Sequence, residues 1–137
     1  MTATINRSTH SVSLLDGEIV EENDLGSIRR VTADNFPILA GMSIKRIVIN
    51  PGAMRTPHWH ANCNELTYCV AGTSLVSVLD NGSRFASFTI SAGEMFHIDS
   101  GSLHHLSRTS APNPPSSSLL SVTNAPRISA SEPLSAR

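Results

Sequence analysis

Three side chains that commonly bind metal ions occur close together in one segment, at His58, His60 and Glu65. His58 and His60 are two residues apart, so on a β-strand both imidazoles leave the same face. Residues 61–64 can turn the chain, which would place Glu65 at the head of the next strand, opposite the histidines. Two neutral imidazoles and a carboxylate suit a divalent ion such as Mn, Fe, Ni, Co or Zn. The segment therefore predicts a metal site built on two adjacent strands.

A further ligand is offered by the histidine pair His104 and His105. The Asp-Ser-Gly-Ser sequence at 99–102 is typical of a tight turn that ends one strand and begins another. Neighbouring residues on a strand point to opposite faces, so only one of the two can reach a site inside the fold. Alternation alone does not say which one it is.

The elements that must position these residues are short strands. Asn81-Gly82 indicates a hairpin, because both residues tolerate positive φ, and no apolar stripe of helical period is long enough to predict a helix. The sequence therefore predicts an all-β sandwich or small barrel. Its β-prone runs are residues 43–50, 66–70, 74–79, 84–90, 95–98 and 117–122.

The composition fits one compact domain. The chain has 137 residues, of which 39% are hydrophobic and 15% charged, with a formal net charge of −1. This balance gives no electrostatic footprint for nucleic acid. We expect residues 1–25 to form an N-terminal arm or short edge strand, residues 26–123 to form the barrel, and residues 124–137, rich in Ser, Ala and Pro, to form a loose tail.

The chain also lacks the usual signals of export. The first residues contain no apolar stretch typical of a signal peptide, and no run approaches the roughly 18 apolar residues of a membrane span. Two cysteines are too few for a disulfide scaffold. We therefore expect a cytoplasmic protein with no membrane partner.

The motif spacings resemble those of the cupin superfamily. The first cupin motif, Gly-x5-His-x-His-x3–4-Glu-x6-Gly, is matched in full, and the second is matched at three positions, with Asp99 and Arg108 replacing its proline and asparagine. The resemblance implies a single-domain double-stranded β-helix, or jelly-roll barrel, and favours His104 over His105 as the fourth ligand. The matching residues are Gly52, His58, His60, Glu65 and Gly72 in the first motif, and Gly93, Gly101 and His104 in the second.

Within the cupins, the sequence around the first two histidines is similar to that of the oxalate decarboxylase and germin-like branch. Arg55 stands three residues before His58, where that branch has an arginine that binds substrate carboxylate. A guanidinium beside a divalent ion would neutralise and orient such a group. The resemblance also favours Mn as the ion and implies a mobile glutamate near it, for which Glu132 is the candidate acid.

These observations lead to three functional hypotheses. The first is a metalloenzyme acting on a small carboxylate, by resemblance an oxalate decarboxylase-like lyase. The second is an Fe or Ni dioxygenase, and the third is a non-catalytic small-molecule-binding barrel. The same three-His, one-Glu set serves both enzyme classes. We also expect a homodimer, as is common among single-domain cupins, because pairing would cover exposed strand edges.

Overall fold

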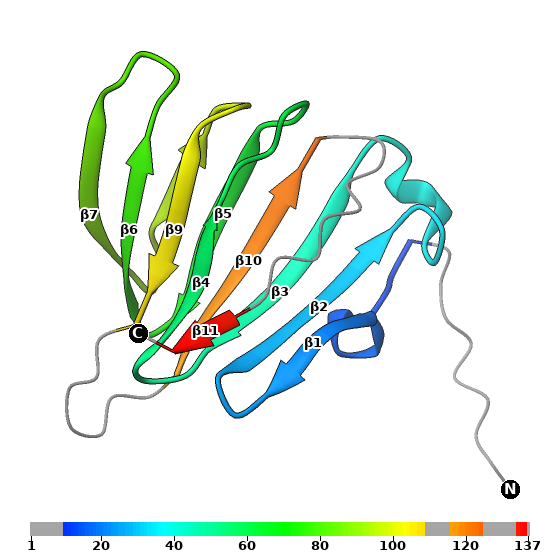
Figure 1. The fold of residues 1–137 in the computed structure, drawn as a ribbon. Coiled ribbons are helices and arrows are strands. Elements are labelled where there is room, and N and C mark those ends of the chain that lie inside the picture. Colours follow the sequence, from blue (N-terminus) through cyan, green and yellow to red (C-terminus); the bar gives the residue numbers. More distant parts are fainter. Residues whose placement is uncertain (1–9, 109–115, 125–133, 137) are drawn as a thin grey trace, which may run out of the picture.

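The computed structural model describes residues 10–108, 116–124 and 134–136, and it consists of two antiparallel sheets facing each other (Figure 1). The first sheet has the order β1-β2-β3-β10-β5-β8, and the second has the order β11-β4-β9-β6-β7. The strands of the first sheet are β1 (Glu18–Asn23), β2 (Gly26–Thr32), β3 (Ser43–Ile49), β10 (Ser117–Thr123), β5 (Glu65–Ala71) and β8 (Met95–Ile98). Those of the second are β11 (Leu134–Ala136), β4 (Ala53–His58), β9 (Leu103–Ser107), β6 (Thr73–Leu79) and β7 (Phe85–Ser91).

The predicted all-β jelly roll is confirmed. All six β-prone runs form strands, and the described residues contain no helix beyond two short 3-10 turns, η1 (Leu14–Asp16) and η2 (Pro37–Leu39). The motif glycines have a backbone reason for their positions. Gly72 has φ +78°, and a Cβ there would lie 2.9 Å from the Cα of Ser117. Gly101 has φ +84°, and a Cβ there would meet the Asn81 side chain at 2.8 Å.

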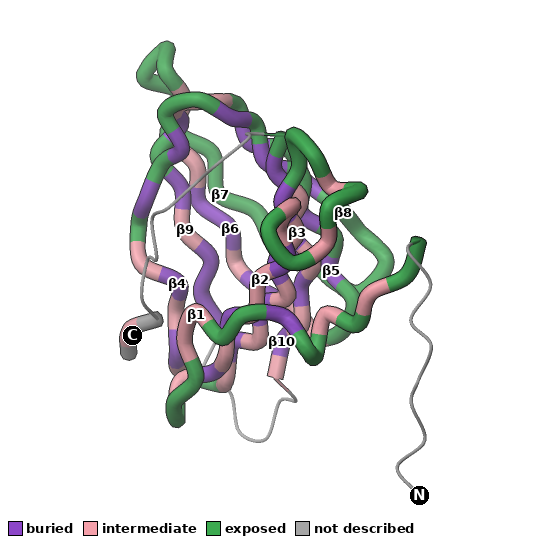
Figure 2. The backbone as a smooth tube through the Cα atoms, turned by 90° about the vertical axis from the view of Figure 1, so that its right-hand side faces the viewer, coloured by how far each residue is buried: buried purple, intermediate pink, exposed green. Residues whose placement is uncertain are grey.

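Alternation along the strands decides which side chains enter the space between the sheets. β3, β5 and β10 bury alternate residues, which appear in Figure 2 as purple segments between pink or green ones. The cluster of buried apolar side chains takes members from both sheets, so burial of these faces holds the sheets together. Its members are Ile28, Ile47, Ile49, Ala53, Cys69, Val76, Ile90, Phe96, Ile98, Leu106 and Leu119.

On one side of the jelly roll, the edges of the two sheets meet through side chains. β7 and β8 are edge strands of different sheets, and all of β7 except Ile90 is exposed. Phe88 on β7 and Phe96 on β8 approach edge to face, with ring centroids 6.0 Å apart. This aromatic contact bridges the two edges where the described strands form no ladder.

Segments at both ends of the chain add strands to the sheets. Residues 18–23, within the expected arm, form β1, which pairs with β2. The sequence predicts a loose segment from residue 124 onward, whereas residues 134–136 form β11 and pair with β4. The Cα partner of Arg55 in this pairing is Leu134. The end of the described chain therefore lies against the strand that carries two of the predicted site residues.

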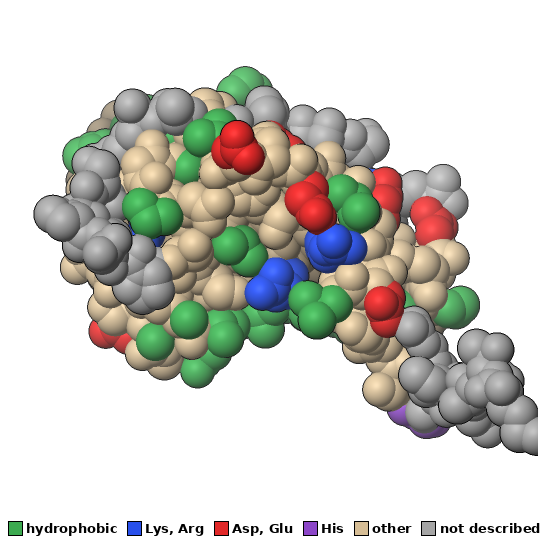
Figure 3. All heavy atoms as spheres, turned by 90° about the horizontal axis from the view of Figure 1, so that it is seen from below, with side chains coloured by type: hydrophobic (Ala, Val, Ile, Leu, Met, Phe, Trp, Pro, Cys, Tyr) green, Lys and Arg blue, Asp and Glu red, His purple; other side chains and the backbone are tan. Residues whose placement is uncertain are grey.

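The surface has no large region of one charge sign on the face shown in Figure 3, where basic and acidic side chains lie next to one another. Two exposed ion pairs join β1 to β2: Arg29 to Glu22 at 2.7 Å and Arg30 to Glu18 at 2.8 Å. None of the helices in the described part of the chain is long and apolar enough to cross a membrane.

Candidate metal centre

A β-bulge in β4 brings Arg55 and His58 to the same face. Arg55 is the Cα partner of Leu106 and His58 that of His104, so three residues of β4 span the length of two residues of β9. Residues three apart would otherwise point to opposite faces. Pro57, which has no N–H to donate to a ladder, lies within the bulge, a place where proline is tolerated. Both Arg55, 1% exposed, and His58, 3% exposed, consequently point inward.

Backbone carbonyls fix which ring nitrogen of two histidines faces the site. The Nδ1 of His58 lies 2.8 Å from the carbonyl oxygen of Thr56, and that of His104 lies 3.0 Å from the carbonyl oxygen of Ser102. A carbonyl can only accept, so both Nδ1 atoms carry the proton and donate it. The Nε2 atoms are then left with their lone pairs directed into the site, as metal-binding histidines require.

Glu65 connects the other members of the site. It is the first residue of β5 and is 2% exposed. Its Oε2 lies 2.9 Å from Nε2 of His60 and 3.6 Å from Nε2 of His104, while its Oε1 accepts a hydrogen bond from Oγ1 of Thr67 at 2.9 Å. His60 lies two residues beyond the end of β4 rather than on the strand, and it is nevertheless buried.

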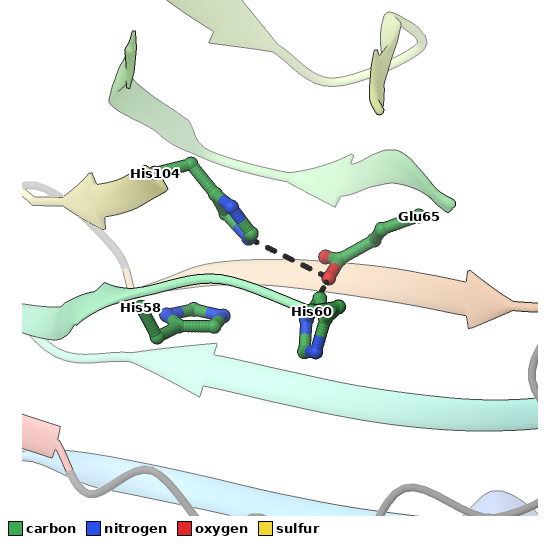
Figure 4. A group of neighbouring side chains, drawn as sticks. All are labelled: His58, His60, Glu65 and His104. Carbon is green, nitrogen blue, oxygen red and sulfur yellow. Dashed lines mark hydrogen bonds and ion pairs between the residues drawn. The ribbon is translucent and has the colours of Figure 1, made fainter. Parts of the chain in front are cut away.

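The four side chains converge as a metal site would need (Figure 4). One ligand atom from each of His58, His60, Glu65 and His104 can be chosen so that all lie within 4.8 Å of one another. Metal–ligand bonds of about 2.1 Å hold such atoms roughly 3 to 4 Å apart. Small side-chain movements would close the set around an ion. Three imidazoles and one carboxylate, all buried, therefore fit a divalent transition metal.

The site is electrostatically prepared for a cation. Burial, assisted by the charges of Arg55 and His104, lowers the pKa of His58 from 6.5 to about 2. Burial alone would raise the pKa of Glu65, but the neighbouring His104 and His60 rings and the Arg55 guanidinium outweigh it and hold the pKa well below the usual range. At neutral pH the site therefore holds an ionised carboxylate and a neutral His58, the forms that bind metals.

Hydrogen bonds between three loops hold the ligand-bearing segments together. The N–H of Gly101 donates to the carbonyl of His60 at 2.7 Å. The N–H of Ser100 donates to Asn64 Oδ1 at 2.9 Å, and the Ser100 carbonyl accepts from Asn81 Nδ2 at 2.7 Å. The turn before His104 is thereby tied both to the His60–Glu65 loop and to the β6–β7 hairpin.

The structure places the remaining candidate residues from the sequence differently with respect to the site. His104 is 1% exposed and faces the site, whereas His105 is half-buried on the opposite face of β9. His97 is exposed, with its Nδ1 3.7 Å from Asp99 Oδ1. Glu132, the candidate acid, lies outside the described residues.

Sequence reasoning missed several polar residues on the inner face of the first sheet. Lys45 is 5% exposed, and Ser121 and Thr123 are 1% and 2% exposed. Lys45 shares its parity on β3 with the buried Ile47 and Ile49, and a lysine in an apolar alternation was the signal that could have revealed it.

Both cysteines are buried free thiols. Burial raises the pKa of Cys63, which the Glu65 charge raises further and the Lys45 charge lowers. Burial also raises the pKa of Cys69, whose side chain belongs to the apolar cluster. The Cys63 thiol, at the loop before β5, thus lies within electrostatic reach of both Glu65 and Lys45.

Two facing antiparallel sheets with a buried three-His, one-Glu group define a jelly-roll protein with a candidate metal centre. The chain belongs to the cupin family, because the family model described as cupin matches residues 13–126.

The relatives include oxalate decarboxylases and germin-like proteins. Oxalate decarboxylase OxdC of Bacillus subtilis is 26% identical over 93 residues, which are 68% of this chain and 24% of that protein. Germin-like protein 5-1 of Oryza sativa subsp. japonica is 33% identical over 87 residues, covering 60% of this chain and 38% of that protein. The chain therefore spans about a quarter of the length of the decarboxylase and little more than a third of the germin-like protein.

Solved structures agree on the fold. A Bacillus subtilis oxalate decarboxylase structure reported for its Mn(II) centres superimposes with a TM-score of 0.77 at 24% identity, covering 86% of this chain and 30% of that one. A deletion mutant of the same enzyme gives a TM-score of 0.78 at 24% identity, over 87% of this chain and 30% of that one. At these identities the likeness concerns the fold alone.

Proposed function

We propose that this cupin binds a divalent metal ion through His58, His60, Glu65 and His104 and acts on a small carboxylate held between that ion and Arg55. The observation that carries the proposal is the convergence of four buried ligand groups beside an arginine that the β4 bulge turns to the same face. Arg55 is 1% exposed, and its charge acts on both His58 and Glu65. A carboxylate bound at the ligand group would therefore lie within reach of a buried guanidinium.

Arg55 is the carboxylate-binding residue in this proposal. Its planar guanidinium offers paired N–H donors to a carboxylate. Its positive charge lies close enough to lower the pKa values of both His58 and Glu65, so it would also act on an anion bound at the ligand group. A divalent ion, when bound, supplies Lewis-acid chemistry that polarises the carboxylate.

Manganese is the ion we propose. The donor set suits Mn, Fe, Co, Ni and Zn, and the structural relatives include an oxalate decarboxylase studied for Mn(II) centres. The comparison with oxalate decarboxylases also favours carbon–carbon cleavage of a small carboxylate, a lyase reaction. Glu132, two residues before β11, is the proposed proton-transferring acid.

The first test is metal content followed by turnover. The untagged protein, produced with mixed metals, should contain near-stoichiometric Mn by mass spectrometry, and a double variant with His58→Ala and His104→Ala should lose it. The Mn form should then release CO₂ from a member of a small-carboxylate panel. Arg55→Ala should retain the metal and lose turnover by about 100-fold or more, in the range seen when an electrostatic catalytic group is removed.

Other outcomes of this test would favour the alternative hypotheses. Stoichiometric Fe or Ni with oxygen uptake coupled to product formation would favour a dioxygenase. Metal with tight ligand binding but no turnover would favour a binding protein. Full activity of Arg55→Ala on every carboxylate would refute the role given to Arg55.

We also propose that two copies of the chain pair through the outer face of the first sheet. Leu66, Tyr68 and Val70 on β5 and Met95 on the edge strand β8 are 40–62% exposed. Tyr68 is the Cα partner of Met95, so the four form one exposed apolar patch, of the kind that marks protein interfaces. Analytical ultracentrifugation should give a dimer for the parent protein and a monomer for Tyr68→Glu.

A further inference from the structure

The tip of the β6–β7 hairpin contains the chemically labile dipeptide Asn81-Gly82. It is the one place in the 137-residue sequence where glycine follows asparagine. An asparagine before glycine is prone to deamidation, because the glycine has no side chain to hinder the approach of its nitrogen to the side-chain carbonyl carbon of the asparagine. Both residues are exposed, so water reaches the place where the reaction would occur.

The hairpin forms as the sequence predicts, but positive φ falls on a different residue. Ser83, and not Asn81 or Gly82, has a positive φ, at +66°. The backbone of position 82 therefore does not require glycine. A Cβ at Gly82 would contact only the Asp80 side chain, at 3.4 Å from Oδ1, which is an ordinary van der Waals distance. Gly82→Ala is consequently a variant that the turn can accept.

The Asp80 carboxylate lies beside the nitrogen that would attack. Its Oδ1 accepts hydrogen bonds from the N–H of Gly82 at 2.9 Å and from the N–H of Arg84 at 2.8 Å. The Gly82 nitrogen must lose its proton as it bonds to carbon, and a carboxylate within hydrogen-bond distance can accept that proton. The hairpin tip thus holds the nucleophile and a base in contact.

The Asn81 side chain also supports the candidate metal centre. Its Nδ2 donates to the carbonyl of Ser100 at 2.7 Å. Ser100 belongs to the turn that carries Ser102, and the Ser102 carbonyl lies 3.0 Å from Nδ1 of His104. The Asn81 amide therefore helps to hold the turn that orients one of the metal-ligand candidates.

We propose that Asn81 is a site of spontaneous deamidation, and that its conversion to aspartate loosens the turn before His104 and weakens metal binding. The Gly82 nitrogen bonds to Cγ of Asn81, and the Cγ–Nδ2 bond breaks. Asp80 carries the proton from the Gly82 nitrogen to the departing Nδ2, which leaves as ammonia. Water then opens the cyclic imide and gives aspartate or isoaspartate at position 81. The effect on the metal rests on the proposed function, whereas the modification itself does not.

An ionised aspartate at position 81 does not replace the amide. It only accepts hydrogen bonds, as does the Ser100 carbonyl, so the contact changes from attractive to repulsive. The turn keeps other hydrogen bonds, from the N–H of Ser100 to Asn64 and from the N–H of Gly101 to the His60 carbonyl. It should therefore loosen without unfolding. The affinity for the ion should fall by about tenfold, the lower end of the range for groups that orient metal ligands.

The first test follows the modification by peptide mass spectrometry during incubation of the full chain at mildly alkaline pH. The parent protein should accumulate aspartate and isoaspartate at position 81, and Gly82→Ala should keep its asparagine over the same period, because the added methyl group hinders the attack. Asp80→Asn keeps an acceptor for both N–H groups but removes the base, so it should react more slowly than the parent. Asn64, which precedes Glu65, is the internal control and should stay unmodified. Absence of modification at position 81, or equal rates in the parent and Gly82→Ala, would overturn the proposal.

The second test measures the consequence with Asn81→Asp, which reproduces one product of the reaction. Calorimetric titration with Mn should give an affinity about tenfold lower than that of the parent, whereas Gly82→Ala, which keeps the amide, should bind Mn as the parent does. Hydrogen exchange at the backbone N–H groups of Ser100 and Gly101 should be faster in Asn81→Asp, with or without the metal.

These measurements separate this inference from the proposed function. If the parent protein binds no Mn, the proposed function fails, while mass spectrometry and hydrogen exchange on the metal-free chain still decide whether position 81 deamidates and whether the turn loosens. If Asn81→Asp binds Mn as tightly as the parent and its exchange at Ser100 and Gly101 is unchanged, the connection from position 81 to the metal ligands is refuted.

Discussion

The two ends of the barrel interior differ in chemistry although the same strands build both. At one end, β3, β10 and β5 present buried polar side chains, among them Lys45, Ser121 and Glu65, and β4 and β9 present His58 and His104. One step along the same strands, the inward residues become apolar. We call these the polar end and the apolar end. The apolar end consists of Ile47, Ile49, Leu119, Cys69, Val76 and Leu106.

This division separates stability from function along the strand direction. The apolar end gains free energy by removing hydrocarbon surface from water. The polar end gives up that gain and requires partners for its buried charges and hydroxyls. Because the strands run through both ends, the apolar end fixes the backbone that positions the ligand groups, and changes at the two ends should have different consequences.

The largest effect is expected from removing a proposed metal ligand at the polar end. His104→Ala should weaken Mn binding by more than about 100-fold, since even indirect partners of metal ligands contribute about 10- to 100-fold. Calorimetric titration with Mn would measure this. His105→Ala is the matched control, because the neighbouring histidine faces away from the site. Loss of Mn binding in His105→Ala but not in His104→Ala would reverse the assignment.

A cavity at the apolar end should lower the stability of the fold and leave Mn affinity nearly unchanged. Leu119 is fully buried, and Leu119→Ala should lower the free energy of unfolding by about 2–5 kcal/mol in urea denaturation of the metal-free protein. The Mn affinity of the folded variant should change little. Leu120→Ala, on the outer face of β10, serves as control and should cost less. A large loss of Mn affinity in folded Leu119→Ala would show that the two ends are coupled.

Low pH should destabilise the metal-free protein through the titratable groups of the polar end. The pKa of His58 is about 2 in the fold against 6.5 for the ordinary side chain, so below pH 6.5 the unfolded chain takes up a proton that the folded chain excludes. The lowered pKa of Glu65 acts in the same direction at lower pH. The contribution of these two groups to the free energy of unfolding is therefore fully present above about pH 6.5, and it is lost as the pH falls.

The size of the acid effect follows from the His58 value. At 1.36 kcal/mol per pKa unit, the metal-free protein should lose about 3 kcal/mol from His58 between pH 7 and pH 4. Urea denaturation across this range measures the loss, and His58→Asn should reduce it. An unfolding free energy that does not change between pH 7 and pH 5 would contradict the assignment of a neutral, buried His58.

The sequence predicted the candidate metal ligands and the central strands, but it did not predict the β4 bulge. Motif spacing identified the converging group of His58, His60, Glu65 and His104, because short turns leave little freedom in how neighbouring strands place their side chains. The β-prone runs identified the central strands. The β4 bulge was not predicted, since one extra residue between Arg55 and His58 is visible only in the pairing with β9.

The buried polar residues on the inner face of the first sheet were missed for a different reason. Ser121 and Thr123 are ordinary strand residues by type, and their inward direction depends on the phase of β10, which Leu119 sets by packing in the core. β11 was missed because three residues of a Ser- and Ala-rich segment carry no strand signal of their own. They form a strand through the partner that β4 provides.

The smallest effect we predict concerns Thr67, which has no direct role as a ligand. Its hydroxyl donates to Glu65 Oε1 at 2.9 Å and is fully buried. Thr67→Val keeps the shape and removes that hydrogen bond, so Mn affinity should fall by about 10-fold in calorimetric titration. The control is Thr73→Val, because the Thr73 hydroxyl bonds to Ser91 on the second sheet, away from the ligands. If both variants bind Mn as the parent does, the carboxylate is oriented by the histidines alone. The polar end would then depend on its ligands and not on the neighbouring side chains that share its buried face.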